Sequence, residues 1–332
     1  MSDFSLQSNL FADDIKQEAT RVGFGRGLKL AGEADERVVA LSADLTESTQ
    51  ISLFKEAFPE RFIEIGVAEQ NLVTVASGLA RAGKIPFTSS YAAFSPGRNW
   101  EQIRTTICLN EMPVKIIGSH AGISVGPDGA THQMLEDIAL MRVLPHMVVV
   151  APGDSIEAEK ATRAIAVNDQ PSYLRLAREK TPIFSTEDSP FEIGKAYVLR
   201  QGSDITLLGT GTMTYQLLVA AKELETQGIQ AEVVHVPTIK PLDTETILRS
   251  LRKTGRAVTA EEAQAAAGFG GLIAELITEN TPMPLLRIGM QDRFGESGTP
   301  AELLDHFGLT GEKMAPKIRQ FVDKVPQYKP GF

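Results

Sequence analysis

Short apolar runs alternate with longer stretches of helical period through the first 180 residues of the chain. The apolar runs that we expect to form buried strands are residues 37–42, 61–65, 84–88, 114–118, 147–150 and 172–176. Helices are expected between them at 14–31, 68–82, 98–109, 133–141 and 155–168. Strands that alternate with helices form a mostly parallel sheet covered by helices, so the predicted fold class is α/β.

A polar segment with two prolines interrupts this regularity at residues 181–194 and suits an interdomain linker. A second, smaller α/β pattern follows the linker. Its strands are expected at 205–208, 231–236, 257–260 and 284–288, and its helices near 214–227, 244–253, 270–279 and 310–324. We therefore divide the chain into an N-terminal extension at 1–12, a first domain at 13–180, the linker, and a second domain at 195–328.

Composition narrows the class of protein. Hydrophobic residues make up 42% of the 332 residues and charged residues 23%, as in a water-soluble globular protein. The formal net charge of −9 argues against a general nucleic-acid binder, which needs a basic face. Cys108 is the only cysteine, so an internal disulfide and a cysteine-based metal cluster are excluded. Neither a signal peptide nor a membrane-spanning run is evident, and we expect a cytoplasmic protein without a membrane partner.

The most informative polar segment is the glycine-rich loop 118–133, which carries His120, Asp128 and His132. An apolar run ends directly before it, so the loop should leave the end of a buried strand, where open α/β sheets place ligands. The spacing of the three residues matches no helical zinc motif. Histidines can transfer protons or bind substrate oxygens, and the aspartate can accept hydrogen bonds from a polyol. The alternative is a set of surface residues in a turn.

A phosphate site is possible where arginines and a hydroxyl group converge. Arg21 lies in the first expected helix, Arg178 ends the segment Tyr-Leu-Arg-Leu-Ala-Arg that contains the last expected strand of the first domain, and Ser48 lies in a loop. Guanidinium groups bind phosphate through paired hydrogen bonds. Each arginine taken alone is better explained as a solvated charge at a helix or strand end, so the phosphate-site interpretation depends on the two arginines meeting in space.

Three further residues have both a structural and a functional explanation. Glu69 lies in the first turn of an expected helix, where a carboxylate interacts favourably with the helix dipole, and a catalytic role requires a group with which it can exchange a proton. Tyr91 and Phe94 could be core residues or a stacking surface for an aromatic cofactor ring, and without further context core packing is the favoured explanation.

Two segments of the second domain carry weaker signals. The glycines at 209–211 and 268–271 lack the full dinucleotide-binding fingerprint, which disfavours a nicotinamide cofactor. The acidic segment Glu261-Glu262-Ala-Gln264 could be an effector or interface feature, but we favour a solvated acidic turn.

Taken in order, four motifs resemble the carboxyl-terminal half of transketolase. They are Ser42-Ala-Asp-Leu-Thr-Glu-Ser48, Gly66-Val-Ala-Glu-Gln-Asn71, Thr88-Ser-Ser-Tyr-Ala-Ala-Phe94, and the loop from His120 through Gly126-Pro-Asp-Gly-Ala-Thr-His-Gln133. The resemblance covers nearly the whole chain. It implies the pyrimidine-binding domain of a thiamine-diphosphate enzyme, with a mostly parallel sheet, followed by the smaller transketolase carboxyl-terminal domain.

The resemblance also implies roles for individual residues. Glu69 matches the glutamate that hydrogen-bonds the aminopyrimidine ring of thiamine diphosphate, and Tyr91 and Phe94 match the aromatic residues around that ring. His132 matches a histidine that transfers protons at the sugar oxygens. Asp128 matches an aspartate that binds a substrate hydroxyl. The matches to sugar-phosphate contacts are His120, Arg21, Ser48 and Arg178. One extra residue falls after Phe94, so no cofactor contact is assigned to residues 95–99.

The chain departs from a full transketolase in one large respect. It lacks the Gly-Asp-Gly motif of the diphosphate-binding domain. The similar Pro127-Asp-Gly129 belongs to the glycine-rich loop 118–133, which the resemblance assigns to the substrate. The resemblance therefore implies one subunit of a split transketolase, inactive alone. An amino-terminal-half partner would hold the diphosphate and Mg²⁺, in a heterotetramer with two chains of each kind. The implied reaction is the transfer of a two-carbon ketol unit from a ketose phosphate to an aldose phosphate, as in pentose phosphate metabolism.

Three alternatives remain at this point. Deoxyxylulose-phosphate synthase and the beta subunit of 2-oxoacid dehydrogenases share this pair of domains, although the motifs 42–45 and 130–133 are more similar to transketolase. A noncatalytic binding or regulatory subunit is the third alternative. It is disfavoured because a scaffold would not need Glu69, His120, Asp128 and His132 together.

Overall fold

The first half of the chain builds a seven-stranded sheet in a computed structural model that describes residues 4–328. The strand order is β12-β6-β7-β5-β4-β2-β3. Six of these strands come from the first half and pair in parallel. They are β2 (Val38–Ser42), β3 (Phe62–Glu64), β4 (Ile85–Tyr91), β5 (Lys115–Ser119), β6 (Val148–Val150) and β7 (Ser172–Arg175). All six fall on apolar runs expected to be strands, and the α/β class is confirmed.

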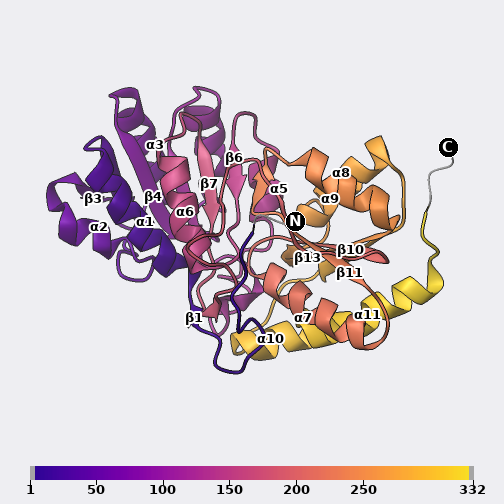
Figure 1. Ribbon diagram of the computed structural model, residues 1–332. Coiled ribbons are helices and arrows are strands. Elements are labelled where there is room, and N and C mark those ends of the chain that lie inside the picture. Colours follow the sequence, from indigo (N-terminus) through magenta and orange to yellow (C-terminus); the bar gives the residue numbers. More distant parts are fainter. Residues whose placement is uncertain (1–3, 329–332) are drawn as a thin grey trace.

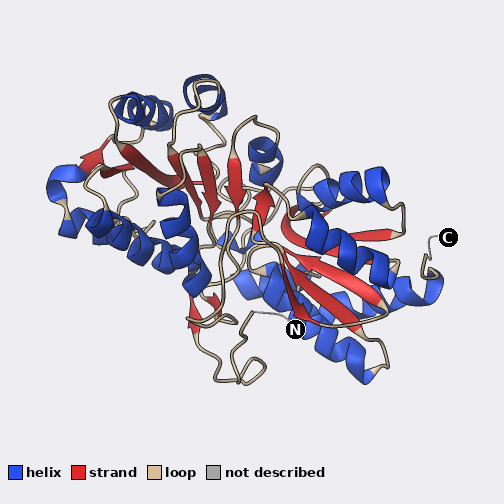
Figure 2. Ribbon diagram, turned by 45° about the horizontal axis from the view of Figure 1, so that its top comes forward, coloured by secondary structure: helices blue, strands red, loops and turns tan. Residues whose placement is uncertain are grey.

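Helices cover both faces of this sheet (Figures 1 and 2). One face packs on α1 (Thr20–Ala34), α2 (Ser52–Ala57) and α6 (Ser155–Ala166). The other packs on α3 (Glu69–Arg81), a π-helical turn (Ile103–Cys108) and α5 (Asp137–Arg142). Alternation along β2 explains the two layers, because Val38 and Ala40 belong to the first apolar cluster and Val39 and Leu41 to the second.

The second half forms a five-stranded sheet in the order β14-β13-β10-β11-β9. Its strands are β9 (Tyr197–Arg200), β10 (Ile205–Gly209), β11 (Ala231–His235), β13 (Ala257–Gln264) and β14 (Leu285–Met290). Only the edge strand β9 pairs antiparallel within this sheet, among the residues described. The helices are α7 (Met213–Thr226), α8 (Thr244–Thr254), α9 (Phe269–Asn280), α10 (Pro300–His306) and α11 (Gly311–Lys324).

The two halves share structure across their boundary. Strand β12 (Thr238–Lys240) belongs to the second half but pairs antiparallel with β6 and extends the first sheet. Conversely, the N-terminal residues Phe4, Leu10 and Ile15 are buried in the apolar cluster of the second half. The apolar clusters therefore tie both sheets together.

Three expected helices differ from those observed. The helix expected at 14–31 begins only at Thr20, because β1 (Gln17–Glu18) pairs with β8 (Thr181–Pro182). The helix expected at 98–109 is a short α4 (Trp100–Gln102) followed by the π-helical turn.

The helix expected at 133–141 begins at Asp137, because the residues before it serve the loop instead of a helix. The Gln133 side chain donates to the backbone oxygen of Glu296, 2.8 Å away in the second half. The expectation for 133–136 was therefore wrong.

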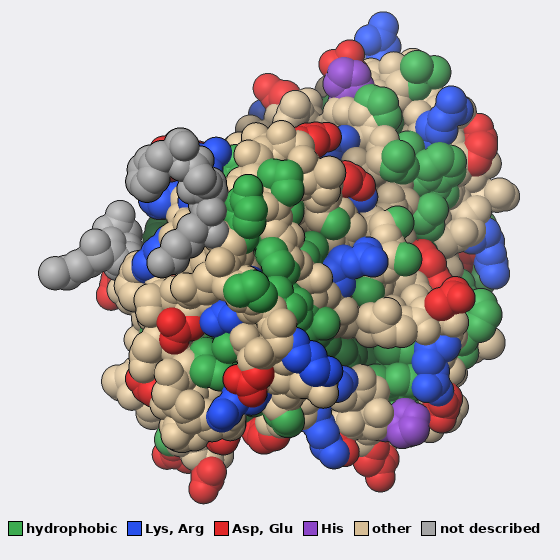
Figure 3. Space-filling view, turned by 90° about the vertical axis from the view of Figure 1, so that its right-hand side faces the viewer, with side chains coloured by type: hydrophobic (Ala, Val, Ile, Leu, Met, Phe, Trp, Pro, Cys, Tyr) green, Lys and Arg blue, Asp and Glu red, His purple; other side chains and the backbone are tan. Residues whose placement is uncertain are grey.

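The outer face of the second half carries charges of both signs. Figure 3 shows its lysine and arginine side chains interspersed with aspartate and glutamate. Over residues 4–328, none of the helices combines the length and apolar character needed to cross a membrane.

Candidate active site

The polar residues expected at the site gather where neighbouring strands end. Strands β7, β5, β4 and β2 lie side by side in that order, and their carboxyl ends meet at one edge of the sheet. Tyr91 ends β4, His120 directly follows β5, and Ser48 lies in the loop after β2. Parallel strands place ligand-binding residues at this edge, so the fold explains why these distant segments meet.

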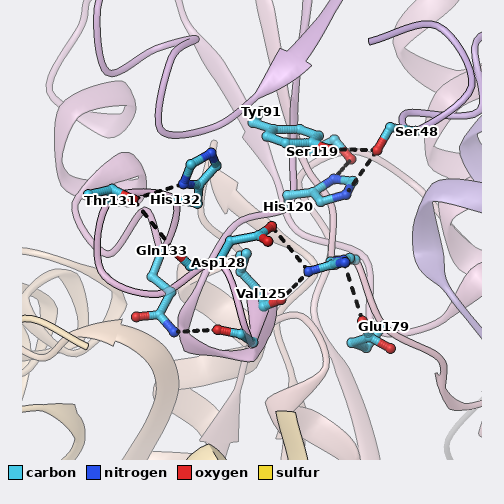
Figure 4. Close-up of polar contacts among 12 residues, drawn as sticks. Ser48, Tyr91, Ser119, His120, Val125, Asp128, Thr131, His132, Gln133 and Glu179 are labelled. Atoms are coloured by element: carbon cyan, nitrogen blue, oxygen red, sulfur yellow. Dashed lines mark hydrogen bonds and ion pairs between the residues drawn. The ribbon is translucent and has the colours of Figure 1, made fainter. Parts of the chain in front are cut away.

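An aromatic and histidine cluster forms the centre of the site (Figure 4). The rings of Tyr91 and His120 stack with their centroids 3.9 Å apart. Phe94 lies 6.2 Å from the Tyr91 ring and 5.4 Å from the His132 ring, which it meets edge-on. The hydroxyl groups of Tyr91 and Ser48 are 2.6 Å apart. The cluster thus joins four of the residues predicted from the sequence to Ser48.

His120 is held as a neutral imidazole. Its side chain is only 1% exposed, its Nδ1 lies 2.8 Å from Ser119 Oγ, and its Nε2 lies 3.4 Å from Ser48 Oγ. Burial lowers the pKa of His120 to about 3, and the nearby positive charges of Arg21 and Arg178 act in the same direction. At neutral pH this ring can form hydrogen bonds but supplies no charge.

The two predicted arginines do converge in space. Arg21 donates to the backbone oxygen of Ser48 at 2.5 Å and to that of Arg178 at 2.9 Å. Arg178 donates to the backbone oxygen of Val125 at 2.8 Å and pairs with Asp128 Oδ2 at 3.1 Å. Burial and the neighbouring Arg178 lower the pKa of Arg21.

These contacts hold the arginines beside the histidine cluster and fix the position of the glycine-rich loop 118–133. Arg21 and Arg178 also line a cavity of about 830 Å³. Residues of α7 and α10 complete its wall, so the cavity lies between the two halves of the chain.

Glu69 is the first residue of α3 and is 3% exposed. Its Oε2 pairs with Arg98 Nη1 at 3.0 Å, and its backbone oxygen accepts a hydrogen bond from Asn99 at 2.8 Å. The Arg98 guanidinium lies 5.4 Å from the centroid of the Phe94 ring. Glu69 is thereby connected to the aromatic cluster through Arg98 and Phe94.

All nine predicted site residues are therefore linked by direct contacts, with Arg98 completing the chain. The resemblance assigned no role to Arg98, because this chain has one extra residue after Phe94 compared with the family and residues 95–99 have no matched positions. The residue type carried a signal nonetheless, since a buried carboxylate needs a cation and Arg98 lies close to Phe94 in the sequence.

The acidic segment of the second half corrects another expectation. Glu261 and Glu262 are 1% and 2% exposed and lie in β13, so they do not form a solvated turn. Glu261 accepts hydrogen bonds from the first backbone N–H groups of α9, and burial raises its pKa to about 7. Glu262 contacts the glycine-rich loop 118–133, where the backbone N–H of Ser124 donates a hydrogen bond to its carboxylate at 3.1 Å.

Metal binding has no support in the described part of the chain. Among residues 4–328, no three His, Cys, Asp or Glu side chains are grouped as a metal site requires. The polar set instead offers a buried carboxylate, stacked aromatic rings, a neutral imidazole and paired guanidinium groups. Such a set can bind an aromatic ring and an anionic polyol side by side.

Two domain families match the chain. The family described as "Transketolase, pyrimidine binding domain" matches residues 16–183, and the family described as "Transketolase, C-terminal domain" matches residues 194–314.

Similar proteins cover almost the same length. The chain is 45% identical over 307 residues to a protein of Methanocaldococcus jannaschii named "Putative transketolase C-terminal section". The matched region covers 92% of this chain and 96% of that protein. The chain is 42% identical over 292 residues to a 6-deoxy-6-sulfo-D-fructose transketolase subunit of a Clostridium species, covering 88% of this chain and 91% of that subunit. A solved structure described as "Split gene transketolase, inactive beta4 tetramer" superposes with a TM-score of 0.86 at 43% identity, over 93% of this chain and 99% of that one.

Proposed function

The chain belongs to the transketolase family as a carboxyl-terminal split-type subunit, and we propose that it transfers two-carbon ketol units when joined by an amino-terminal-half partner. The donor would be a ketose phosphate and the acceptor an aldose phosphate. The observation that carries the proposal is the single connected cluster that unites Glu69, the aromatic pair, the loop histidines and the two arginines.

The residues present fit the thiamine diphosphate on which this family depends. Glu69 offers a buried carboxylate, and within the described residues its Oε1 accepts no hydrogen bond. Phe94 and Tyr91 offer stacked ring faces nearby. We assign these three residues to the aminopyrimidine ring of the cofactor, which supplies a carbanion at its thiazolium ring when bound. Glu69 would hold a proton at the pyrimidine nitrogen.

The opposite side of the cluster suits an anionic sugar. Arg21 and Arg178 supply positive charge for the terminal phosphate, and His120 and Ser48 supply neutral hydrogen-bonding groups beside them. Asp128 is exposed and His132 half-buried, so both are accessible to hydroxyl groups near the reacting carbons. Binding energy at the phosphate would position those carbons.

The diphosphate and its Mg²⁺ would be held by the partner. Support comes from the names of the relatives, which describe a "C-terminal section", a "subunit" and a "split gene" product whose tetramer is inactive. We propose a heterotetramer with two chains of each kind, acting in the cytoplasm in pentose phosphate metabolism. We also keep the division into an extension, two domains and a linker at 181–194 as a proposal.

A sulfonate sugar is a second candidate substrate. One relative is named for 6-deoxy-6-sulfo-D-fructose, and a guanidinium pair binds a sulfonate in the same way as a phosphate. The two arginines of this chain would therefore accept a sugar with either a phosphate or a sulfonate at its end.

A donor panel tests the proposal. The chain, its partner, thiamine diphosphate and Mg²⁺ are assayed with four substrates: a ketose phosphate plus an aldose phosphate acceptor, 6-deoxy-6-sulfofructose plus the same acceptor, pyruvate plus glyceraldehyde phosphate, and branched 2-oxoacids. We expect ketol transfer from at least one of the anionic ketoses. Turnover of pyruvate alone would indicate a deoxyxylulose-phosphate synthase, and turnover of 2-oxoacids alone a dehydrogenase subunit. An assembly that binds cofactor without any turnover would indicate a noncatalytic subunit.

A further inference from the structure

The second half of the chain is hydrogen-bonded to the glycine-rich loop 118–133, called here the substrate loop, through one buried carboxylate. Glu262 Oε2 accepts the Ser124 backbone N–H at 3.1 Å, and Ser124 lies in the 3-10 turn Ile123–Val125 within the loop. Glu262 Oε1 accepts the Thr212 hydroxyl at 3.0 Å and lies 3.6 Å from Arg175 Nη1. A single side chain thus joins β13, the start of α7, the end of β7 and the loop.

The loop backbone is shaped to admit this carboxylate. Gly122 has a φ of +89°, and a methyl group there would lie 2.5 Å from the Glu262 carboxylate. Only glycine combines that backbone conformation with so close an approach. Further along the loop, Gly129 lies against Ser297, where a methyl group would be 2.5 Å from the hydroxyl oxygen.

Charge balance keeps Glu262 in place. Arg175 is 6% exposed and pairs with Asp137 Oδ2 at 2.9 Å, which also accepts the Tyr173 hydroxyl at 2.9 Å. Burial favours the neutral form of Arg175, but the carboxylates of Asp137 and Glu262 outweigh it and raise the arginine pKa above its ordinary value. A neutral side chain at 262 would leave Arg175 with one carboxylate instead of two.

We propose that Glu262 is a positioning residue that holds the substrate loop in its reactive arrangement, so the second half of the chain takes part in ketol transfer through the loop. Asp128 and His132 lie downstream of Ser124 on the same loop, whereas Glu69 lies on α3. Loss of the Glu262 contact should therefore disturb the sugar side of the site and leave the cofactor side intact. The kinetic part of this inference rests on the proposed function.

Hydrogen exchange in the isolated chain tests whether Glu262 holds the loop, without any assay of activity. The variant is Glu262→Gln, and the matched control is Glu261→Gln, which alters an equally buried neighbour that bonds to α9 and makes no hydrogen bond to the loop among the described residues. We expect the backbone amides of residues 122–126, 128 and 129 to exchange at least tenfold faster in Glu262→Gln than in Glu261→Gln. Equal exchange in the two variants would overturn the proposal.

Steady-state kinetics of the assembled enzyme test the consequence. In Glu262→Gln we expect kcat/KM for the donor sugar to fall at least tenfold, while the thiamine diphosphate concentration for half-maximal activity stays within twofold. Glu261→Gln should keep both values near wild type. A parallel loss of sugar and cofactor affinity, or an equal loss in both variants, would show a merely structural role.

A second variant covers the case in which Glu262→Gln does not fold. Thr212→Val removes one hydrogen bond to Glu262 with little change of shape, and we expect a two- to fivefold fall in kcat/KM at constant cofactor requirement. An unchanged kcat/KM would overturn the proposal. An inactive wild-type assembly would refute the proposed function, while the exchange experiment would still decide whether Glu262 holds the loop.

Discussion

At the scale of single residues, burial changes what each candidate can do. An exposed loop histidine can carry a positive charge near neutral pH. His120 is instead buried beside two arginines, which keeps its imidazole neutral. Glu69 combines 3% exposure with a position at a helix N-terminus, where partial positive charge favours a carboxylate. Residue type and spacing suggested both residues, but only the fold shows that they belong to one cluster.

Replacing Glu69 by glutamine should abolish catalysis and preserve the fold. An amide cannot exchange the proton that we assign to this carboxylate, so we expect ketol transfer by the assembled enzyme to fall by about 10²–10⁴-fold. The measurement is the initial rate at saturating cofactor, with circular dichroism as a check on folding. Glu101→Gln, at an exposed position on α4, is the matched control and should keep the wild-type rate. Wild-type turnover by Glu69→Gln would remove the assignment.

The pKa of His120 predicts a signature in the pH dependence of stability. The folded value of about 3 lies below the ordinary value of 6.5, so between these values the unfolded chain binds one proton more than the folded chain. This contribution to stability is complete above pH 6.5 and is lost as the pH falls toward 3. Denaturant unfolding across that range should give a steeper fall for wild type than for His120→Gln, by up to about 1.4 kcal/mol per pH unit. Parallel curves would contradict the prediction.

At the scale of elements, long apolar runs were predicted well and short or tertiary-dependent elements were not. The strands β2 to β7 each overlap an expected apolar run, although β4 continues three residues past its run to Tyr91. Helix α2, with six residues, and strand β12, with three, are too short to show a period. The bounds of α1 depend on the pairing of Gln17–Glu18 with residues 181–182, which no local pattern encodes.

Close packing of α1 on α6 gives a prediction at this scale. A methyl group at Gly23 would lie 1.9 Å from the backbone oxygen of Ser155, so the two helices could not keep their separation. We expect Gly23→Ala to lower the free energy of unfolding by about 1–3 kcal/mol. Gly78 is the matched control, because it lies inside α3 with open space around its Cα, and Gly78→Ala should stabilise the chain by up to about 1 kcal/mol. Equal effects of the two substitutions in chemical denaturation would contradict this account.

At the scale of the whole molecule, the two halves of the chain share strand pairing and apolar clusters across their boundary. The resemblance to transketolase supplied the nine candidate site residues, because the matching residues can be recognised locally in the sequence. It did not identify Arg98 or Glu262, whose roles depend on partners in other segments. Glu262 contacts Ser124, Thr212 and Arg175, and a sequence that shows only two adjacent glutamates gives no sign of these contacts. Burial of charge against distant partners is therefore the part of this site that local patterns could not predict.

We propose that this chain supplies half of a ketol-transfer site and that a partner polypeptide supplies the other half. The most direct test is to assay the chain alone, the amino-terminal-half polypeptide alone, and their mixture for ketol transfer with thiamine diphosphate and Mg²⁺. We expect ketol transfer only in the mixture, with both polypeptides eluting together in size-exclusion chromatography. Full activity of the isolated chain would contradict this proposal.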